Sequence, residues 1–267
     1  MKSNLFIFSA LFLLLIGKVA FGKPVILTAN ESLPYWSKTL PHNGLGGELV
    51  EAISRAGGVE STIEFVPLKR MIEDTTDNNL GNPVFYMDNQ DFATIIPIAI
   101  TQVSLYYYNP LHDKKVTFNS LKDLKGFRVG ALSGTMANRA TFEQAGVIFE
   151  TSYSQESLFK KLQHGRLDFV LELDLVGQQT IARIFPDERK NFTVIALPKS
   201  VSPIAIMLDK NYPNVGNIAN RYRQGLAKII KDGSYNEIIS SYYESHQLPL
   251  AWLKELERFS RLYQTTP

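Results

Sequence analysis

The chain has 267 residues, of which 45% are hydrophobic, and it carries 28 Lys and Arg against 26 Asp and Glu for a formal net charge of +2. A chain of this length can bury stable hydrophobic cores without covalent staples. The balanced charge excludes the basic surface that nucleic-acid binding requires. The absence of cysteine excludes disulfides, thiolate metal sites, a cysteine nucleophile and a lipid-modified cysteine. The expected partners are therefore small molecules or other proteins.

Residues 1–22 have the pattern of a secretory signal peptide. Lys2 supplies the positive start, residues 5–16 form an apolar run, and the small residues Ala20 and Gly22 stand where a signal peptidase cleaves. An uncleaved membrane anchor is the alternative, but the run is too short to span a bilayer comfortably, and no later segment reaches the ~18 apolar residues of a membrane helix. We expect cleavage near Gly22, a mature chain in which 26 basic residues balance 26 acidic ones, and no stable membrane insertion.

Short apolar segments alternate with helical periodicity along the rest of the chain. Strands are expected at 25–30, 61–68 and 83–87, twice within 93–108, and at 127–132, 146–153, 167–171, 192–198 and 203–209. Helices are expected at 46–58, 68–78, 154–165, 175–185 and 214–233. This alternation occurs once before and once after residues 109–115, which predicts an α/β fold of two lobes with mostly parallel sheets.

The stretch RVGALSGTMANR, residues 128–139, joins an expected strand to a possible helix through a Ser-Gly-Thr turn. Backbone N–H groups at such a turn can hold an anion or another strong acceptor. A nucleotide P-loop is excluded because only three residues separate Gly130 from Gly134 and no lysine follows. A hydrolase nucleophile elbow is excluded because Ala131 stands where that motif needs glycine. An ordinary strand–turn–helix connection is the alternative.

At KSVSPIAIMLDKNYPNVGNIANRYRQGLAKIIKDGSYNEIISSYY the chain resembles the C-terminal end of family 3 bacterial extracellular solute-binding proteins, the bilobed periplasmic receptors of polar amino acid transporters. Three further segments are similar to the family's first helix, its strand-and-glycine stretch and its helix–Gly–Arg–x–Asp–strand unit: GGELVEAISRAGG, NSLKDLKGFRVGALSGTMANR and LFKKLQHGRLDFVLELD. The resemblance is colinear over about residues 24–245 and leaves the tail from Leu248 outside it.

The resemblance implies a type II periplasmic-binding fold, in which two mostly parallel mixed sheets, flanked by helices, are joined by two crossing hinge segments. Lobe 1 would comprise residues 23–110 and 204–267, and lobe 2 would comprise residues 111–203. A ligand would lie between the lobes, which close on it by hinge motion. The protein would act in the periplasm and serve a membrane ABC permease.

The carboxylate site implied by the resemblance is incomplete in this sequence. The family usually follows its third strand with an arginine that clamps the ligand carboxylate in two bonds, but no arginine occurs here between Arg70 and Arg128. Arg70 and Arg139 are the candidate substitutes, and a solvated helix-face arginine is the alternative for each. The family holds the same carboxylate at a turn matched here by Ser133, Gly134 and Thr135.

The acid that would take a ligand ammonium is also displaced. The family places it five residues after the Asp of its Gly–Arg–x–Asp unit, and five residues after Asp168 is Leu173, flanked by Glu172 and Asp174. Alternation along a strand would direct Glu172 and Asp174 to one side, so both are candidate ammonium acceptors. The same two carboxylates could instead form a general acid/base pair.

Aromatic residues indicate an apolar or ring-bearing ligand. Tyr35 and Trp36 lie in a loop where the family places an aromatic platform, and Tyr86 ends the expected third strand. The alternative for Trp36 is a half-buried lid on the core. Trp252 and Phe259 have the spacing of a C-terminal helix that packs on the core.

Three functions share this fold, and the fold alone does not separate them. We expect a periplasmic solute-binding protein that captures a small polar or zwitterionic, amino-acid-like ligand for an ABC-type transporter, acting as a monomer without a cofactor. The four histidines have no metal-ligand spacing, and no nucleophile–base pair stands out, so we expect no catalysis. The alternatives are a periplasmic dehydratase-like enzyme, for which Glu172 or Asp174 would act on the substrate ring, and a stand-alone ligand sensor.

Overall fold

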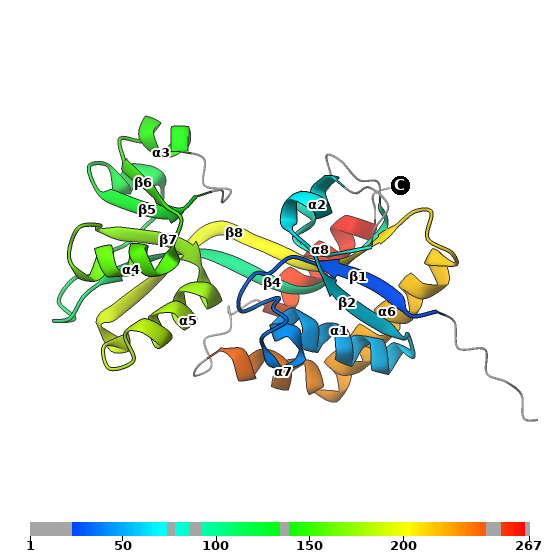
Figure 1. Cartoon of the computed structure of the whole chain (residues 1–267). Coiled ribbons are helices and arrows are strands. Elements are labelled where there is room, and N and C mark those ends of the chain that lie inside the picture. The colour runs from blue at the N-terminus through cyan, green and yellow to red at the C-terminus, as the bar shows by residue number, and fades with distance from the viewer. Residues whose placement is uncertain (1–22, 74–77, 86–91, 134–138, 244–251, 265–267) are drawn as a thin grey trace, which may run out of the picture.

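The computed structural model describes residues 23–73, 78–85, 92–133, 139–243 and 252–264. Its helices and strands form two lobes joined by two long strands, β4 (Phe92–Tyr108) and β8 (Phe192–Asp209) (Figure 1). The two-lobed α/β fold predicted from the sequence is confirmed. The predicted signal peptide lies outside the described residues. Within the described ranges, no helix combines the length and the apolar character that a bilayer crossing needs.

Lobe 1 combines segments from the beginning and the end of the chain. Its short strands are β1 (Val25–Ala29), β2 (Ser61–Phe65) and β3 (Asn79–Gly81). Its helices are α1 (Gly44–Gly57), α2 (Leu68–Glu73), α6 (Val215–Asp232), α7 (Ser234–Tyr242) and α8 (Trp252–Gln264), with 3₁₀ turns η1 (Pro41–Asn43) and η2 (Pro83–Phe85).

Lobe 2 is the segment between β4 and β8. Its strands are β5 (Arg128–Leu132), β6 (Ile148–Ser152) and β7 (Phe169–Leu173). Its helices are α3 (Arg139–Gln144), α4 (Gln155–Gln163) and α5 (Asp174–Ile184), with 3₁₀ turns η3 (Leu121–Leu124) and η4 (Arg189–Asn191).

The strands pair as one eight-stranded sheet in the order β2-β1-β3-β8-β4-β7-β5-β6. Within each lobe the strands linked by helical crossovers are parallel, β1 with β2 and β3 and β5 with β6 and β7. β4 and β8 are antiparallel to each other and to their outer neighbours. The two sheets expected from the sequence are continuous because β4 and β8 each run through both lobes, and each of these strands replaces two shorter strands that were predicted.

The ladder between β4 and β8 is interrupted where it passes from one lobe to the other. Gln102 pairs with Val201, but two residues later Ser104 pairs with Ala196, so four residues of β8 stand opposite one residue of β4. Such a bulge bends its strand and increases the local twist. The crossing between the lobes therefore lies at this irregularity.

Hydrophobic packing changes from one lobe to the other at the same place. The largest cluster packs β1, α1, α6, α7 and α8 against the first half of β4. Leu105, Tyr106 and Tyr107, in the second half of β4, belong to two clusters of lobe 2. The boundaries at 110/111 and 203/204 stay a prediction, although the apolar packing changes lobes earlier along β4.

Helix α5 contacts both lobes. Leu175 and Val176, in its first turn, are buried in the lobe 1 cluster, whereas Ile181, further along, is buried in lobe 2. The start of α5 is consequently fixed by packing from two sides, and it is this end of the helix that carries Asp174.

The prediction of a strand at 83–87 is wrong at residues 83–85, and residues 86–87 lie outside the described residues. The structure places β3 earlier, at Asn79–Gly81, and turns the chain at η2. Pro83 lacks the N–H that strand pairing needs, and the side-chain oxygen of Asn82 accepts the Val84 N–H at 3.1 Å, which closes the turn.

Helix α6 packs closely against α1 because both helices carry glycine at the contact. A Cβ on Gly225 would lie 2.2 Å from the Ile53 carbonyl oxygen, and a Cβ on Gly57 would lie 2.3 Å from the Arg221 carbonyl oxygen. Both distances are shorter than real Cβ contacts, so only glycine permits this approach. The apolar stripe predicted for α6 faces lobe 1, with Tyr222 fully buried.

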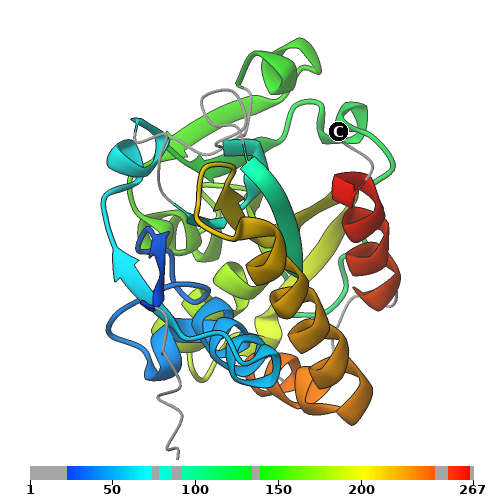
Figure 2. The same cartoon turned by 90° about the vertical axis from the view of Figure 1, so that its right-hand side faces the viewer.

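Helix α8 lies on lobe 1 beside α6 and over β4 (Figure 2). Trp252 and Phe259 are buried, which confirms the predicted packing of a C-terminal helix on the core. The Trp252 indole N–H donates to the Tyr235 hydroxyl at 2.8 Å, and that hydroxyl donates to the Ile98 carbonyl of β4 at 2.9 Å. A hydrogen-bonded chain thus connects α8, α7 and β4.

Replacing Trp252 with alanine should lower the free energy of unfolding by about 3–5 kcal/mol, because it removes a buried aromatic side chain and leaves a cavity. Lys254→Ala is the matched control, since Lys254 is exposed on the same helix, and it should change stability by no more than ~0.5 kcal/mol. Urea unfolding measures both variants. Equal, small losses would contradict the docking of α8.

Candidate functional site

Asp174 lies where the two lobes meet. It begins α5 directly after β7, and its side chain is buried. Its Oδ1 accepts the Leu175 N–H at 2.8 Å and the Tyr35 hydroxyl at 3.4 Å, and its Oδ2 accepts the Tyr243 hydroxyl at 3.3 Å. Both tyrosines belong to lobe 1, so two long hydrogen bonds to this carboxylate tie lobe 1 to the start of α5.

The backbone at Asp174 is anchored by a tyrosine of β4. The Tyr106 hydroxyl donates to the Asp174 carbonyl at 2.5 Å. A Cβ on Gly177 would lie 2.4 Å from Cζ of the same tyrosine, so glycine lets the helix rest directly on the ring. The Tyr35 hydroxyl also lies 3.0 Å from the Thr101 hydroxyl of β4. Side chains from three segments, β4, the loop that holds Tyr35 and the end of α7, therefore converge on the start of α5.

The protonation of this cluster follows from its burial. Burial raises the pKa of Asp174, and hydrogen bonds from the Leu175 N–H and the Tyr243 hydroxyl oppose that shift. The pKa values of Tyr35 and Tyr243 are raised because both hydroxyls are buried beside Asp174. The tyrosines consequently remain protonated donors, and Asp174 is satisfied within the protein.

Glu172 has a different environment from Asp174. It is the second-last residue of β7, opposite Ser104 of β4, and only 7% exposed. Its Oε1 accepts the Leu173 N–H at 2.9 Å, but its Oε2 is buried without a hydrogen-bond partner among the residues that the structure describes. Burial raises the pKa of Glu172, since the charged form loses its hydration, and hydrogen bonding from the Leu173 N–H and the Gln155 side chain of α4 opposes that shift. Within normal hydrogen-bond distance Oε2 has no donor among the described residues, so it can accept from a ligand.

Glu172 lies at the carboxyl edge of the lobe 2 sheet, next to lobe 1. β5 and β7 are parallel with Ala131 opposite Leu171, so Leu132 and Glu172 follow side by side where both strands end. Leu173, the next residue, packs against the lobe 1 cluster. The carboxyl edge of an open α/β sheet is where such folds place ligands.

The predicted strand alternation from Glu172 to Asp174 is wrong. β7 ends at Leu173, and Asp174 is the first residue of α5. Since the period of two applies only within a strand, the two carboxylates take separate environments. The structure favours Glu172 over Asp174 as an acceptor for a ligand, because Asp174 already has protein donors on both oxygens.

The predicted arginines are placed on different lobes. Arg70 is exposed on α2 and makes no ion pair with any residue in the described ranges. Arg139 begins α3, where it donates to the Phe149 carbonyl at 3.0 Å and lies 3.4 Å from the Glu143 carboxylate. Arg139 is thus occupied by lobe 2 itself, and a role for either arginine in ligand binding stays a prediction.

The predicted N–H cradle is described only at its first residue. The Ser133 N–H donates to the Ser152 carbonyl at 2.7 Å, so it extends the pairing of β5 with β6. Gly134 and Thr135, which carry the rest of the prediction, lie outside the described residues. Tyr86 also lies outside them.

Tyr35 and Trp36 are core residues of lobe 1, with exposures of 2% and 3%. The Trp36 ring lies over the start of α1, where a Cβ on Gly46 would be 2.4 Å from the indole. The platform expected in a loop is therefore buried under helix α1 in this structure, and its contact with a ligand stays a prediction. The sequence did not predict that Tyr243 donates a hydrogen bond to Asp174. Its only sequence feature is an aromatic residue at the end of a helix, which does not identify a partner so far away in the chain.

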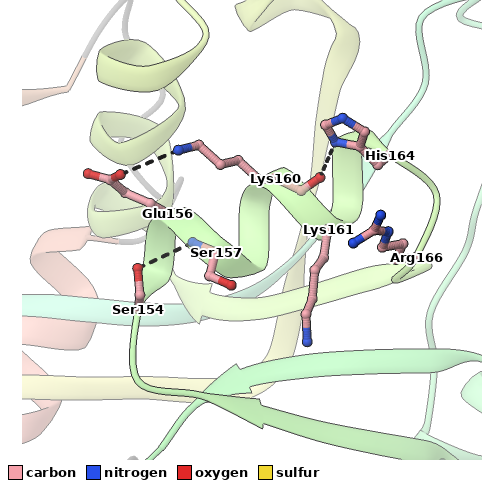
Figure 3. Close-up of a pocket in the computed structure, with 7 residues that line it drawn as sticks. All are labelled: Ser154, Glu156, Ser157, Lys160, Lys161, His164 and Arg166. Carbon is pink, nitrogen blue, oxygen red and sulfur yellow. Dashed lines mark hydrogen bonds and ion pairs between the residues drawn. The ribbon is translucent and has the colours of Figure 1, made fainter.

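A cavity of about 350 Å³ runs along α4 of lobe 2 (Figure 3). Its basic side chains have neighbours of their own: Lys160 lies 3.8 Å from Glu156, and His164 Nδ1 lies 2.8 Å from the Lys160 carbonyl oxygen. Arg166 lines the same cavity from the turn that follows. Glu156, the acid that lines this cavity, is paired with Lys160 and with Arg183 of α5. Within the described ranges no three His, Asp or Glu side chains cluster as metal ligands.

Comparison with known proteins identifies the fold. No protein-family model and no curated protein matches the chain. The GluR0 ligand-binding core from Nostoc punctiforme, solved with L-glutamate, is similar to it, with 16% identity, 82% of this chain and 99% of that chain covered, and a TM-score of 0.59. So is a histidine kinase sensor domain with similarity to periplasmic binding proteins, with 14% identity, coverages of 83% and 96%, and a TM-score of 0.60.

An ancestral cationic amino acid solute binding protein is also similar, with 19% identity, coverages of 82% and 94%, and a TM-score of 0.60. Identities this low show the fold alone. The bilobed periplasmic-binding fold implied by the sequence resemblance is thereby confirmed.

Tyr243→Phe should lower the free energy of unfolding by about 1–3 kcal/mol, because it removes a donor from a buried carboxylate. Tyr153→Phe is the control, since Tyr153 is 94% exposed, and it should leave stability unchanged. Chemical denaturation of the two variants checks the prediction. A Tyr243→Phe variant as stable as the parent would show that the hydroxyl contributes nothing to the cluster.

Glu172→Gln should stabilise the ligand-free protein by about 1 kcal/mol at pH 7, which corresponds to ~2–4 °C in Tm. An acid whose pKa is raised on folding binds more protons in the native state, so its contribution to stability falls as pH rises from the unfolded pKa to the folded one. The gain should therefore vanish near pH 3, well below the ordinary glutamate pKa of about 4.3, where the carboxyl is protonated in both states. Thermal unfolding at both pH values tests this, and a loss of stability at pH 7 would contradict it.

Proposed function

We propose that this chain is a solute-binding protein that captures a small polar or zwitterionic, amino-acid-like ligand between its lobes for a membrane ABC permease. The observation that carries the proposal is Glu172, a buried carboxylate with one unpartnered oxygen at the edge of lobe 2 that adjoins lobe 1. Cleavage of the signal peptide at 1–22, a periplasmic location, a monomeric state and the absence of catalysis belong to the same proposal.

The similar structures support a ligand between the lobes. One was solved with L-glutamate, another is described as a cationic amino acid solute binding protein, and an ancestral arginine-binding protein bound to arginine covers 84% of this chain at a TM-score of 0.58. The interrupted pairing of β4 and β8 gives the two lobes a place at which to turn.

A ligand sensor is the second candidate function. The likeness to a histidine kinase sensor domain extends over 83% of this chain. In a sensor, closure of the lobes would be transmitted to another protein, and no transport would follow. Both functions require the same ligand site, so the binding experiment below applies to each.

A thermal-shift screen with amino acids, amines, dicarboxylates and aromatic acids tests the proposal. A ligand at a hundred times its Kd should add ~2.7 kcal/mol of stability, a Tm increase of several degrees. Glu172→Gln should remove most of this increase. Glu150→Gln should preserve it, because Glu150 is an acid of the same lobe that already pairs with Lys161 at 2.9 Å. No shift with any compound, or the same loss in both variants, would contradict the proposed site.

A further inference from the structure

The charge of the ligand can be inferred from the groups that adjoin its proposed site. Glu172 is buried, and when its carboxyl is ionised the unpartnered Oε2 accepts hydrogen bonds and cannot donate one. A buried carboxylate without a partner is costly, and a cationic donor removes that cost most completely. A ligand carboxylate placed here would instead be repelled.

β4, the strand beside Glu172, contains no charged side chain. It runs from Phe92 to Tyr108 and pairs with β7, where Ser104 lies opposite Glu172. The neighbouring strand therefore supplies no cation that could hold a ligand carboxylate at this edge.

The described cations of lobe 2 that adjoin its sheet are engaged within the lobe. Arg128 holds Asp168 through two hydrogen bonds of 2.8 and 3.0 Å, and it lies at the opposite, amino end of β5. Arg139 is bound to β6 and to its own helix, and Lys161 pairs with Glu150. A carboxylate at the Glu172 edge would thus lack a cation from these groups.

We propose that Glu172 receives the ammonium or guanidinium group of an organic cation that needs no carboxylate for binding, so that the ligand class is an alkylamine or alkylguanidine. This inference rests on the proposed function, because it names the ligand of that same site. It differs from the expected amino-acid-like zwitterion in one respect, the missing carboxylate. Arg70 then has no ligand group to clamp.

Three matched pairs of probes isolate the carboxylate: arginine with agmatine, lysine with cadaverine, and ornithine with putrescine. Each amine is its amino acid without the carboxylate. Isothermal titration calorimetry of the unmodified protein should show, in at least one pair, an amine that binds as tightly as its parent amino acid or more tightly. Glu172→Gln should weaken that amine at least tenfold, and Glu150→Gln and Arg70→Ala should change its Kd by less than threefold.

Two results would overturn the inference, and they are distinguishable. Tighter binding of the amino acid in every pair that binds, lost in Arg70→Ala, would show that the carboxylate is recognised; the proposed solute-binding function would then stand and the inference would fall. The absence of binding by all six probes would also overturn the inference, and the broader thermal-shift screen would then decide the proposed function separately. Because Glu172→Gln is expected to be more stable than the parent at pH 7, a loss of binding in that variant is not a loss of folding.

Discussion

A buried carboxylate at the junction of the lobes, Asp174, fixes the geometry on which the site depends. Burying an ionised carboxylate is unfavourable unless donors replace its water, and here the Leu175 N–H and the hydroxyls of Tyr35 and Tyr243 do so. Because the tyrosines come from lobe 1 and the carboxylate from the start of α5, these bonds set where β7 ends. The end of β7 in turn sets the position of Glu172.

Only one residue separates Glu172 from Asp174, yet Asp174 has a structural role and Glu172 is the proposed ligand-binding residue. Asp174 has its acceptors filled by the protein, whereas Glu172 keeps an oxygen buried without a partner among the described residues. The unpartnered oxygen lowers the free energy of unfolding of the ligand-free protein. A bound cation that donates to this oxygen would remove the penalty, and the difference would contribute to the binding free energy. A residue that binds a ligand keeps an acceptor available for it, whereas a polar core residue has its hydrogen-bonding atoms paired within the protein.

Much of the fold was predictable because its patterns are long and regular. The periodic α6 and the alternation of short strands with helices required two α/β lobes, and the structure has them. The sequence could not show that β8 is continuous, because its extra residues, 197–200 opposite Val103 of β4, include a proline and polar residues, which are typical of a loop between two shorter strands. Polar Gln102 and Ser104 similarly interrupt the apolar pattern of β4. Nor could it separate Glu172 from Asp174, since the strand-to-helix change at Leu173 is what sends their side chains into different surroundings.

The central claim is that the lobes turn about the β4–β8 crossing to enclose a ligand. The chain has no cysteine, so Lys69→Cys on α2 and Tyr153→Cys after β6 would place two spin labels on different lobes at exposed positions. Double electron–electron resonance would measure the distance between them before and after saturation with a binding compound. The account predicts a shorter distance in the bound protein, and an unchanged distance distribution despite proven binding would contradict it.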